Sequence, residues 1–241
     1  MRLAVISDIH GNLEAFRQVL IDIDRSHIDQ VLCLGDNIGY GPEPEAVVKL
    51  LRERHIPSVM GNHELGIKDP AIFHWFNSSA QASLLLTRQL ISNDTLAFIA
   101  DLPATHKLGD CLGVHGCPPD SVTRYLFDVS VEELAVLFRD LPQRLTFVGH
   151  THDLELICWD GLELTRQELS PGVVSIQQSY RYLVNVGSVG QPRDGNNNAK
   201  YVIYDDADNL LEVRYVSYDI ATTADKIIQL GFPRYYATRL W

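Results

Sequence analysis

Residues 3–12 read Leu-Ala-Val-Ile-Ser-Asp-Ile-His-Gly-Asn and contain the clearest structural signal in the chain. Its apolar run, Leu3–Ile6, is short and continuous, which is typical of a strand covered on both faces. Asp8 and His10 follow at once. Apolar residues then recur at helical spacing after Asn12, which is a suitable N-cap. The stretch therefore predicts a strand, a polar turn and a helix.

The same alternation continues to about residue 60. We expect a second strand over 31–34, a second helix over 44–54 and a third short strand over 57–60. Strands that alternate with helices in this order pair in parallel through right-handed crossovers.

The remainder of the chain changes character twice. Residues 66–103 carry helical patterns without a strand pattern. Strands are then expected over 111–115, 145–148, 154–159, 162–167, 182–186, 201–204 and 211–218, followed by a helix over 221–230. Repeats, low-complexity tracts and linkers are absent from the sequence. We therefore expect one domain over residues 1–241, with a helical insertion at about 66–103.

Composition excludes several classes of protein. The 241 residues are 46% hydrophobic, and a chain of this length buries enough surface to fold without a metal or a disulfide. Twenty basic residues against 31 acidic ones give a net charge of −11, which argues against general binding to nucleic acids or membrane surfaces. No apolar run is long enough to span a membrane, the start is unlike a secretory signal, and the four cysteines form no CxxC pair. We expect a complete, cytoplasmic chain with reduced thiols.

The chemistry lies at the ends of the expected strands, where each strand is followed by a small group of polar residues and glycine. The groups are Asp8-Ile9-His10, Gly35-Asp36, Gly61-Asn62-His63-Glu64, His115-Gly116 and Gly149-His150-Thr151-His152. Because the carboxyl ends of parallel strands share one edge of a sheet, five of the nine histidines should converge there. Carboxylate, imidazole and amide oxygen together suit a divalent ion such as Mn, Fe, Ni or Zn.

The spacing of these ligands also carries information. On an extended chain Asp8 and His10 point the same way and can chelate one ion. His150 and His152 repeat this spacing, although a bend would direct their rings to neighbouring ions. The ligands are too many for one tetrahedral site, so we expect two ions that share a carboxylate, for which Asp36 is the natural candidate.

In order and spacing the five groups resemble the motifs of the calcineurin-like metallophosphoesterase superfamily: D-x-H, G-D, G-N-H-[DE], H-G and G-H-x-H. This match covers positions 8–152. The segments Gly39–Pro42, Asn185–Gly195 and Tyr218–Gly231 are similar to a bacterial branch of small phosphodiesterases and phosphatases. The resemblance implies an α/β fold, namely a four-layer α-β-β-α sandwich of two mixed sheets flanked by helices.

The resemblance also implies roles for individual residues. One metal would be held by Asp8, His10, Asp36 and His152, and the second by Asp36, Asn62, His115 and His150. His63 would protonate the leaving oxygen, and Glu64 would orient or tune His63. Two divalent ions, with manganese favoured over iron, nickel or zinc, would generate a hydroxide for in-line attack on phosphorus.

Two departures from the family pattern bear on the substrate. Protein serine/threonine phosphatases of this superfamily carry arginines where this chain has Gly39-Tyr40-Gly41 and Leu65, which argues against phosphoprotein substrates. Cys117 stands where the branch commonly has serine, and we interpret it as a buried thiol in preference to an oxidisable or metal-tuning one.

We therefore expect a metal-dependent phosphodiesterase that acts on a small, nucleotide-like phosphoester. Candidate substrate contacts are Asn12, Tyr40 and Arg193. Arg193 lies in a loop that either cradles phosphate or forms a structural turn, whereas Tyr40, Trp75 and Phe76 either stack on a nucleobase or pack, with packing favoured. The alternatives are a phosphomonoesterase, whether protein phosphatase or dinucleoside polyphosphate hydrolase, and a non-catalytic scaffold of the same fold. A scaffold tends to lack the acid histidine or a ligand, and this chain keeps all of them.

Overall fold

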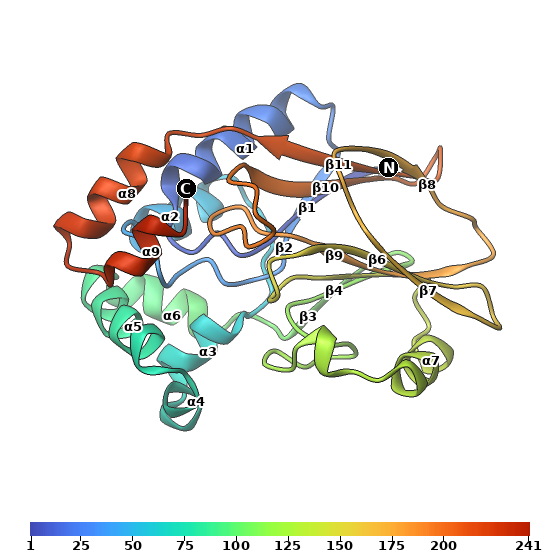
Figure 1. Cartoon of the computed structure of the whole chain (residues 1–241), viewed down its shortest axis with the longest axis horizontal. Helices are drawn as coiled ribbons and strands as arrows, with labels where there is room; N and C mark the ends of the chain where they lie inside the picture. Colours follow the sequence, from blue (N-terminus) through green and yellow to red (C-terminus); the bar gives the residue numbers. More distant parts are fainter.

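Two β-sheets face each other, and helices cover their outer faces (Figure 1). The computed structural model describes residues 1–241. The five-stranded sheet has the order β2 (Gln30–Cys33), β1 (Arg2–Ile6), β10 (Ala199–Asp205), β11 (Leu210–Val216) and β8 (Gly172–Ser175). The six-stranded sheet has the order β3 (Thr105–Leu108), β4 (Cys111–Val114), β5 (Leu145–Val148), β9 (Arg181–Val186), β6 (Leu154–Trp159) and β7 (Leu164–Glu168).

Both sheets are mixed. In the first, β1 runs parallel to β2, and the other neighbours are antiparallel. In the second, β4, β5 and β9 run parallel, and the strands outside them are antiparallel to their neighbours. The parallel strands of the two sheets provide the ends from which the polar loops leave.

Three apolar clusters hold the layers together. The cluster between the sheets includes Val5, Phe147 and Val202, all fully buried. On the outer face of the first sheet, α1 (Leu13–Arg25) buries its apolar side, including Phe16, against strand residues such as Ile203. On the outer face of the second, α7 (Val131–Asp140) and the 3₁₀ turn η1 (Leu126–Asp128) cover β4, β5, β6 and β9. Removing this apolar surface from water is the main stabilising term, and the layers confirm the expected α-β-β-α sandwich.

The remaining helices gather at one end of the sheets (Figure 1). They are α2 (Pro44–Glu53), α3 (Asn62–Lys68), α4 (Pro70–Trp75), α5 (Ser78–Leu90), α6 (Asn93–Ala100), α8 (Ile220–Gln229) and α9 (Arg234–Thr238). The expected helical segment 66–103 thus holds α4 to α6 and the end of α3. None of the helices has both the length and the apolar character needed to cross a bilayer.

Several sequence-based expectations need correction. The third strand over 57–60 is wrong: only a single parallel bridge joins Ser58 to Cys33, and the backbone of Met60 donates instead to Pro103. The edge strands β3 and β8 and the helices α7 and α9 were not expected. For α7 the signal was present, because Ser130 and Glu133 form a capping box.

Candidate metal centre

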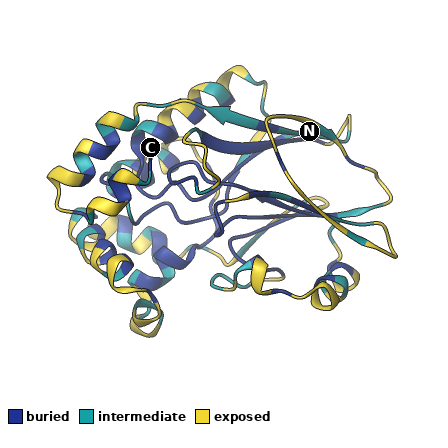
Figure 2. Cartoon of the chain, viewed as in Figure 1, coloured by how far each residue is buried: buried dark blue, intermediate teal, exposed yellow.

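The polar loops meet at the ends of the parallel strands, where they are buried (Figure 2). Asp8 and His10 follow β1, Asp36 follows β2, His115 follows β4, and His150 and His152 follow β5, while Asn62 and His63 begin α3. All eight side chains are buried, and three groups among them could hold a metal ion. The five histidines that the motifs single out therefore lie together.

Strained backbone aims these side chains. Five of the eight residues have positive φ angles, from 49° to 69°: Asp8, His10, Asp36, His150 and His152. L-residues rarely adopt this left-handed region, and such strain clusters at functional sites. The expectation that Asp8 and His10 lie on an extended chain is therefore wrong. Their side chains still converge, with 3.7 Å between Asp8 Oδ1 and His10 Nε2.

The first cluster contains Asp8, His10 and His152. His152 Nε2 lies 3.2 Å from Asp8 Oδ1 and 3.2 Å from His10 Nε2. The outer nitrogens of the two rings are held by backbone carbonyls, His10 Nδ1 by Ile38 at 3.1 Å and His152 Nδ1 by Gln191 at 2.5 Å. These bonds fix the rings so that both Nε2 atoms face inward.

The second cluster contains Asn62, His115 and His150. His115 Nε2 lies 2.9 Å from Asn62 Oδ1 and 3.2 Å from His150 Nδ1. The carbonyl of Leu34 holds the other nitrogen of His115 at 2.8 Å, and that of Thr123 holds His150 Nε2 at 3.2 Å. His150 therefore presents Nδ1 to the second cluster, whereas His152 belongs to the first. Of the two arrangements that the sequence left open for these histidines, the structure has the one in which a bend separates the rings.

Asp36 lies between the two clusters. Its Oδ2 is 3.4 Å from His115 Nε2, 3.7 Å from His10 Nε2 and 3.9 Å from His63 Nε2. Its Oδ1 accepts the backbone N–H of His63 at 2.9 Å, which fixes the carboxylate. One carboxylate oxygen is thus within reach of both clusters, as a shared ligand requires.

The donor set fits two divalent cations. Two carboxylates, four imidazoles and an amide oxygen surround the site, and this mixture suits mid-row transition ions. Asp8 Oδ1 is buried and has no hydrogen-bond donor. An unpaired buried oxygen of this kind is costly unless a cation or a donor meets it.

The electrostatics of the site follow from burial and proximity. Burial would raise the pKa of Asp36, but the charges of His115 and His63 outweigh it and hold that pKa well below its usual range. Burial lowers the pKa of His115, yet Asp36 raises it to about 9. Burial together with the charge of His115 lowers the pKa of His150 to about 3, and burial together with Arg193 lowers that of His152 to about 4. Asp36 is therefore ionised and His150 and His152 are neutral, whereas His115 must release a proton before it can bind a metal ion.

Glu64 holds the backbone of the site. Its carboxylate accepts N–H groups from Asp36 at 3.0 Å, Asn37 at 2.8 Å, Ile38 at 3.3 Å and Gly61 at 2.9 Å. Burial and the charge of Asp36 raise the pKa of Glu64 to about 7. Glu64 thus anchors the loop that carries Asp36, and its sequence-predicted action on His63 stays a prediction.

His63 sits in a close-fitting cage. Its ring packs edge-on against Tyr40 at 4.3 Å and Phe76 at 5.0 Å, and its buried Nδ1 has no hydrogen-bond partner. Gly39 lies against the ring so closely that a Cβ there would be 2.1 Å from His63 Nδ1. Burial lowers the pKa of His63 well below its usual value.

The three predicted substrate contacts differ in position. Asn12 is buried, accepts the N–H of Ala15 and the hydroxyl of Thr223, and donates to Gly190. It therefore ties α1 to α8 and to the loop after β9. Tyr40 packs between His63 and Tyr236, 4.5 Å from the latter ring. The amide of Asn12 is held by hydrogen bonds and the ring of Tyr40 by packing, and the substrate roles of both residues stay predictions.

Arg193 has a partly open position. Its Nη2 donates to Gln191 Oε1 at 3.3 Å, its buried Nε has no partner, and it lines a surface pocket with Arg239 and Trp241. Its contact with phosphate also stays a prediction. Cys117 is buried in the cluster under η1 and α7, where burial raises the pKa of its thiol, so it is a packing residue.

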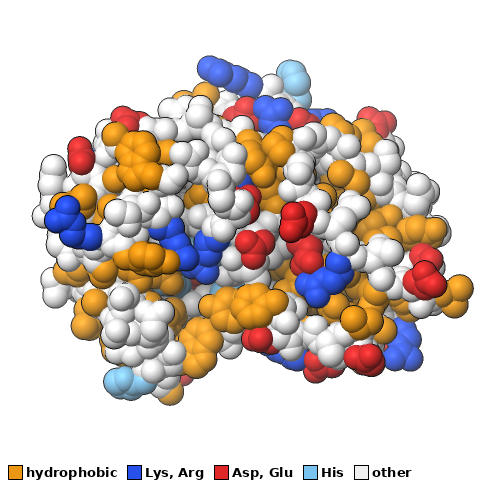
Figure 3. All heavy atoms as spheres, in the orientation of Figure 1, with side chains coloured by type: hydrophobic (Ala, Val, Ile, Leu, Met, Phe, Trp, Pro, Cys, Tyr) orange, Lys and Arg blue, Asp and Glu red, His pale blue; other side chains and the backbone are white.

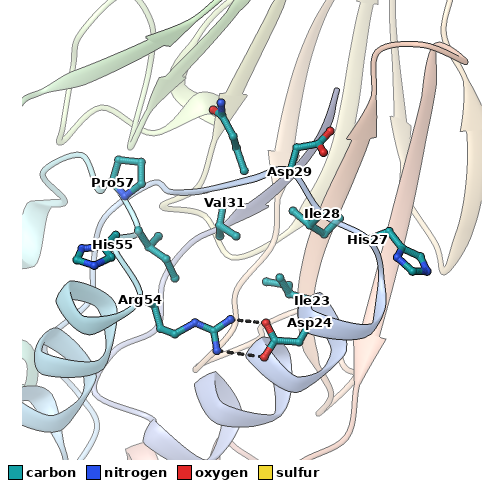
Figure 4. A pocket seen from close by; sticks show the side chains of 11 residues that line it. Ile23, Asp24, His27, Ile28, Asp29, Val31, Arg54, His55 and Pro57 are labelled. Atoms are coloured by element: carbon teal, nitrogen blue, oxygen red, sulfur yellow. Dashed lines mark hydrogen bonds and ion pairs between the residues drawn. The ribbon is translucent and has the colours of Figure 1, made fainter.

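Sequence reasoning missed Tyr125. Its ring stacks on that of His150, with 3.8 Å between centroids and 10° between planes. Tyr125 lies in the irregular segment between β4 and η1, and no strand-end motif marks it. Another surface pocket, between the ends of α1 and α2, is crossed by the Arg54–Asp24 ion pair and shares no residue with the metal centre (Figure 4).

Comparisons with known proteins agree with this site. Residues 1–209 match the model of the calcineurin-like phosphoesterase superfamily domain. An uncharacterized protein from Methanocaldococcus jannaschii, MJ0912, is 36% identical over 244 residues, which cover 99% of this chain and 97% of that protein. The crystal structure of a metallophosphoesterase from Sphaerobacter thermophilus is 33% identical with a TM-score of 0.85, covering 100% and 98% of the two chains. Protein PH1004 from Pyrococcus horikoshii shares the fold, with 19% identity and a TM-score of 0.80 over 100% and 97% of the chains.

The chain belongs to the calcineurin-like phosphoesterase superfamily, a class of metal-dependent hydrolases of phosphoric esters. The expected family and fold are thereby confirmed. The family uses divalent cations, and the buried Asp and His clusters of this chain could bind them.

Proposed function

We propose that the protein is a phosphodiesterase that hydrolyses small phosphodiesters, including nucleotide-type ones, with two divalent cations, manganese being favoured. The observation that carries the proposal is the position of Asp36 Oδ2, 3.4 Å from His115 Nε2 in the second cluster and 3.7 Å from His10 Nε2 in the first. Asp8, His10 and His152 would hold one ion with Asp36, and Asn62, His115 and His150 the other. When bound, the ions supply Lewis-acid chemistry: they acidify water and neutralise the charge of the phosphoryl group.

The chain's own residues supply proton transfer and position. His63 is the candidate proton donor to the leaving oxygen, because its Nε2 faces the centre, 3.9 Å from Oδ2 of the shared-ligand candidate Asp36. Gly39, Tyr40 and Phe76 hold that ring, and Glu64 holds the loop beneath Asp36. Each contact limits how far the donor and the shared carboxylate can drift.

We base the preference for diesters over monoesters on the arginines that this chain lacks at the site. A diester carries one negative charge where a monoester carries up to two. The places at which the protein serine/threonine phosphatases of the family have arginines are here Gly39–Gly41 and Leu65, and Tyr40 packs on the rings of His10 and His63. Arg193, whose charge acts on His152, is left as the cationic partner for one phosphoryl oxygen.

The test compares two substrates and two variants. With manganese restored, bis(p-nitrophenyl) phosphate is expected to exceed p-nitrophenyl phosphate at least about tenfold in kcat/KM. His63→Ala is expected to lower kcat by about 10²–10⁴-fold while the metal content stays at two ions per chain. His106→Ala, on edge strand β3, is the matched control and keeps wild-type rates. A higher kcat/KM for the monoester makes the protein a monoesterase, and two bound ions without hydrolysis of either ester make it a scaffold.

A further inference from the structure

Three aromatic rings line the outer side of the second cluster, and we name Trp75, Tyr125 and Phe127 the aromatic wall. Tyr125 stacks on the metal-ligand candidate His150 at 3.8 Å. Phe127 stacks on Tyr125 at 4.7 Å with 12° between planes, and Trp75 lies 6.3 Å from Tyr125 at 30°. A column of nearly parallel rings thus runs outward from the metal centre.

The outer rings of the wall are open to solvent. Phe127 is 63% exposed and Trp75 is 50% exposed, and only two other aromatic side chains, Tyr235 and Trp241, are as open to solvent. Figure 3 shows large hydrophobic side chains beside basic ones near the middle of the face turned to the reader. Large exposed rings that adjoin a site indicate a binding surface more often than a packing need.

The wall comes from two separate parts of the chain. Trp75 ends α4, and Tyr125 and Phe127 flank the start of η1, so only the tertiary structure brings them together. The wall adjoins the candidate metal centre through the stacking of Tyr125 on His150.

We propose that the aromatic wall is a subsite that stacks the planar ring of the substrate, with a nucleobase as its fitting occupant. The proposal rests on the proposed function, which places the phosphoryl group at the metal centre next to His150. A flat π-system continues the ring column with the offset or parallel geometry that aromatic pairs prefer. A saturated alkyl group gains no such stacking, so the wall would favour nucleotide-type esters over alkyl ones.

The experiment measures binding with a matched pair of ligands. AMP and ribose 5-phosphate differ by the adenine ring, so the ratio of their Kd values isolates the ring's contribution. Titration calorimetry on the manganese-loaded protein is expected to give a Kd for AMP about tenfold below that for ribose 5-phosphate, a ratio within the range of base–aromatic stacking. In the double variant Trp75→Ala/Phe127→Ala the ratio is expected to fall below about twofold.

Two further variants make the result specific. The single variant Trp75→Phe, in which Phe127 is unchanged, keeps an aromatic ring at position 75. It is expected to keep most of the wild-type ratio of the two Kd values. Leu162→Ala, at a 92% exposed apolar residue in the β6–β7 turn, is the control for loss of exposed apolar surface and keeps the wild-type ratio. Thermal melting checks that each variant is folded.

The outcomes separate this proposal from the proposed function. A wild-type ratio near one, or a ratio unchanged in the double variant, overturns the aromatic subsite while diester hydrolysis remains. If the tenfold ratio collapses in the double variant but the wild-type protein hydrolyses no phosphoester, the subsite stands and the catalytic proposal fails.

Discussion

Replacing Gly39 by alanine places a methyl group against the ring of His63. The new Cβ would lie 2.1 Å from His63 Nδ1 and 2.9 Å from Cε1, more than about 1 Å short of ordinary contact. The ring cannot retreat easily, because Tyr40 and Phe76 pack on it at 4.3 and 5.0 Å. We therefore expect the ring to be displaced by about 1 Å.

A displacement of that size costs roughly 100-fold in rate when the displaced group takes part in the reaction. Gly39 also has a φ of +85°, where an L-residue adds about 1–2 kcal/mol of strain. Gly161→Ala separates the two effects: Gly161 has a φ of +106°, and a Cβ there meets nothing within 4 Å. It is expected to lose about 1–2 kcal/mol of stability and no activity.

The assay is steady-state hydrolysis of bis(p-nitrophenyl) phosphate, with metal content by elemental analysis and stability by urea unfolding. Gly39→Ala is expected to lower kcat about 100-fold and to keep two ions, because the three atoms nearest to the new methyl group all belong to His63. A folded Gly39→Ala protein with kcat within twofold of wild type refutes the claim that this contact positions His63.

Three other predictions concern the shared ligand, the loop anchor and a distant ion pair. Asp36→Asn replaces the carboxylate between the clusters with a neutral amide, so elemental analysis is expected to find fewer than two ions per chain; full occupancy would show that Asp36 is not shared. Glu64→Gln turns an amide toward backbone N–H groups and leaves donors unpaired, so urea unfolding should show a loss of about 2–4 kcal/mol, and a loss below about 0.5 kcal/mol contradicts the anchoring role. Asp22 accepts bonds from Arg214 at 2.7 and 3.0 Å and from Tyr201 at 2.7 Å; burial would raise its pKa, but these donors hold that pKa below its usual value. Its contribution is therefore present above the unfolded pKa and is lost as pH falls through the folded one, so Asp22→Asn should be about 1–2 kcal/mol less stable than wild type at pH 7 and the gap should shrink below about pH 4. A gap that is constant between pH 7 and pH 3 contradicts this account.

Local sequence patterns predicted a large part of the fold. The run Leu3–Ile6 and the apolar spacing after Asn12 predicted β1 and α1, because burial on two faces or on one helical stripe leaves a periodic record in a few consecutive residues. The strand predicted over 57–60 is wrong because an apolar run records burial and does not by itself record strand pairing. Apolar residues there are buried without forming a ladder, since the neighbouring backbone bonds to Pro103 instead.

The types of ligand were also evident from the sequence, because Asp, Asn and His directly after buried strands must collect where those strands end. Their assignment to two clusters came only from the family resemblance, because the spacing of the residues left it open. The rings of His150 and His152 face different partners because the backbone of both residues is left-handed. Strand spacing alone predicts the same direction for both rings.

The sequence alone predicted most of the strand–helix order, the types of the candidate metal ligands and the family. Asp36 was already the candidate for the shared carboxylate, whereas only the folded chain reveals that Glu64 binds the backbone of a distant loop and that Tyr125 covers His150. The difference arises from how far apart in the sequence the interacting residues lie. Donor chemistry and apolar period belong to neighbouring residues, whereas these contacts join segments that meet only when the two sheets pack face to face.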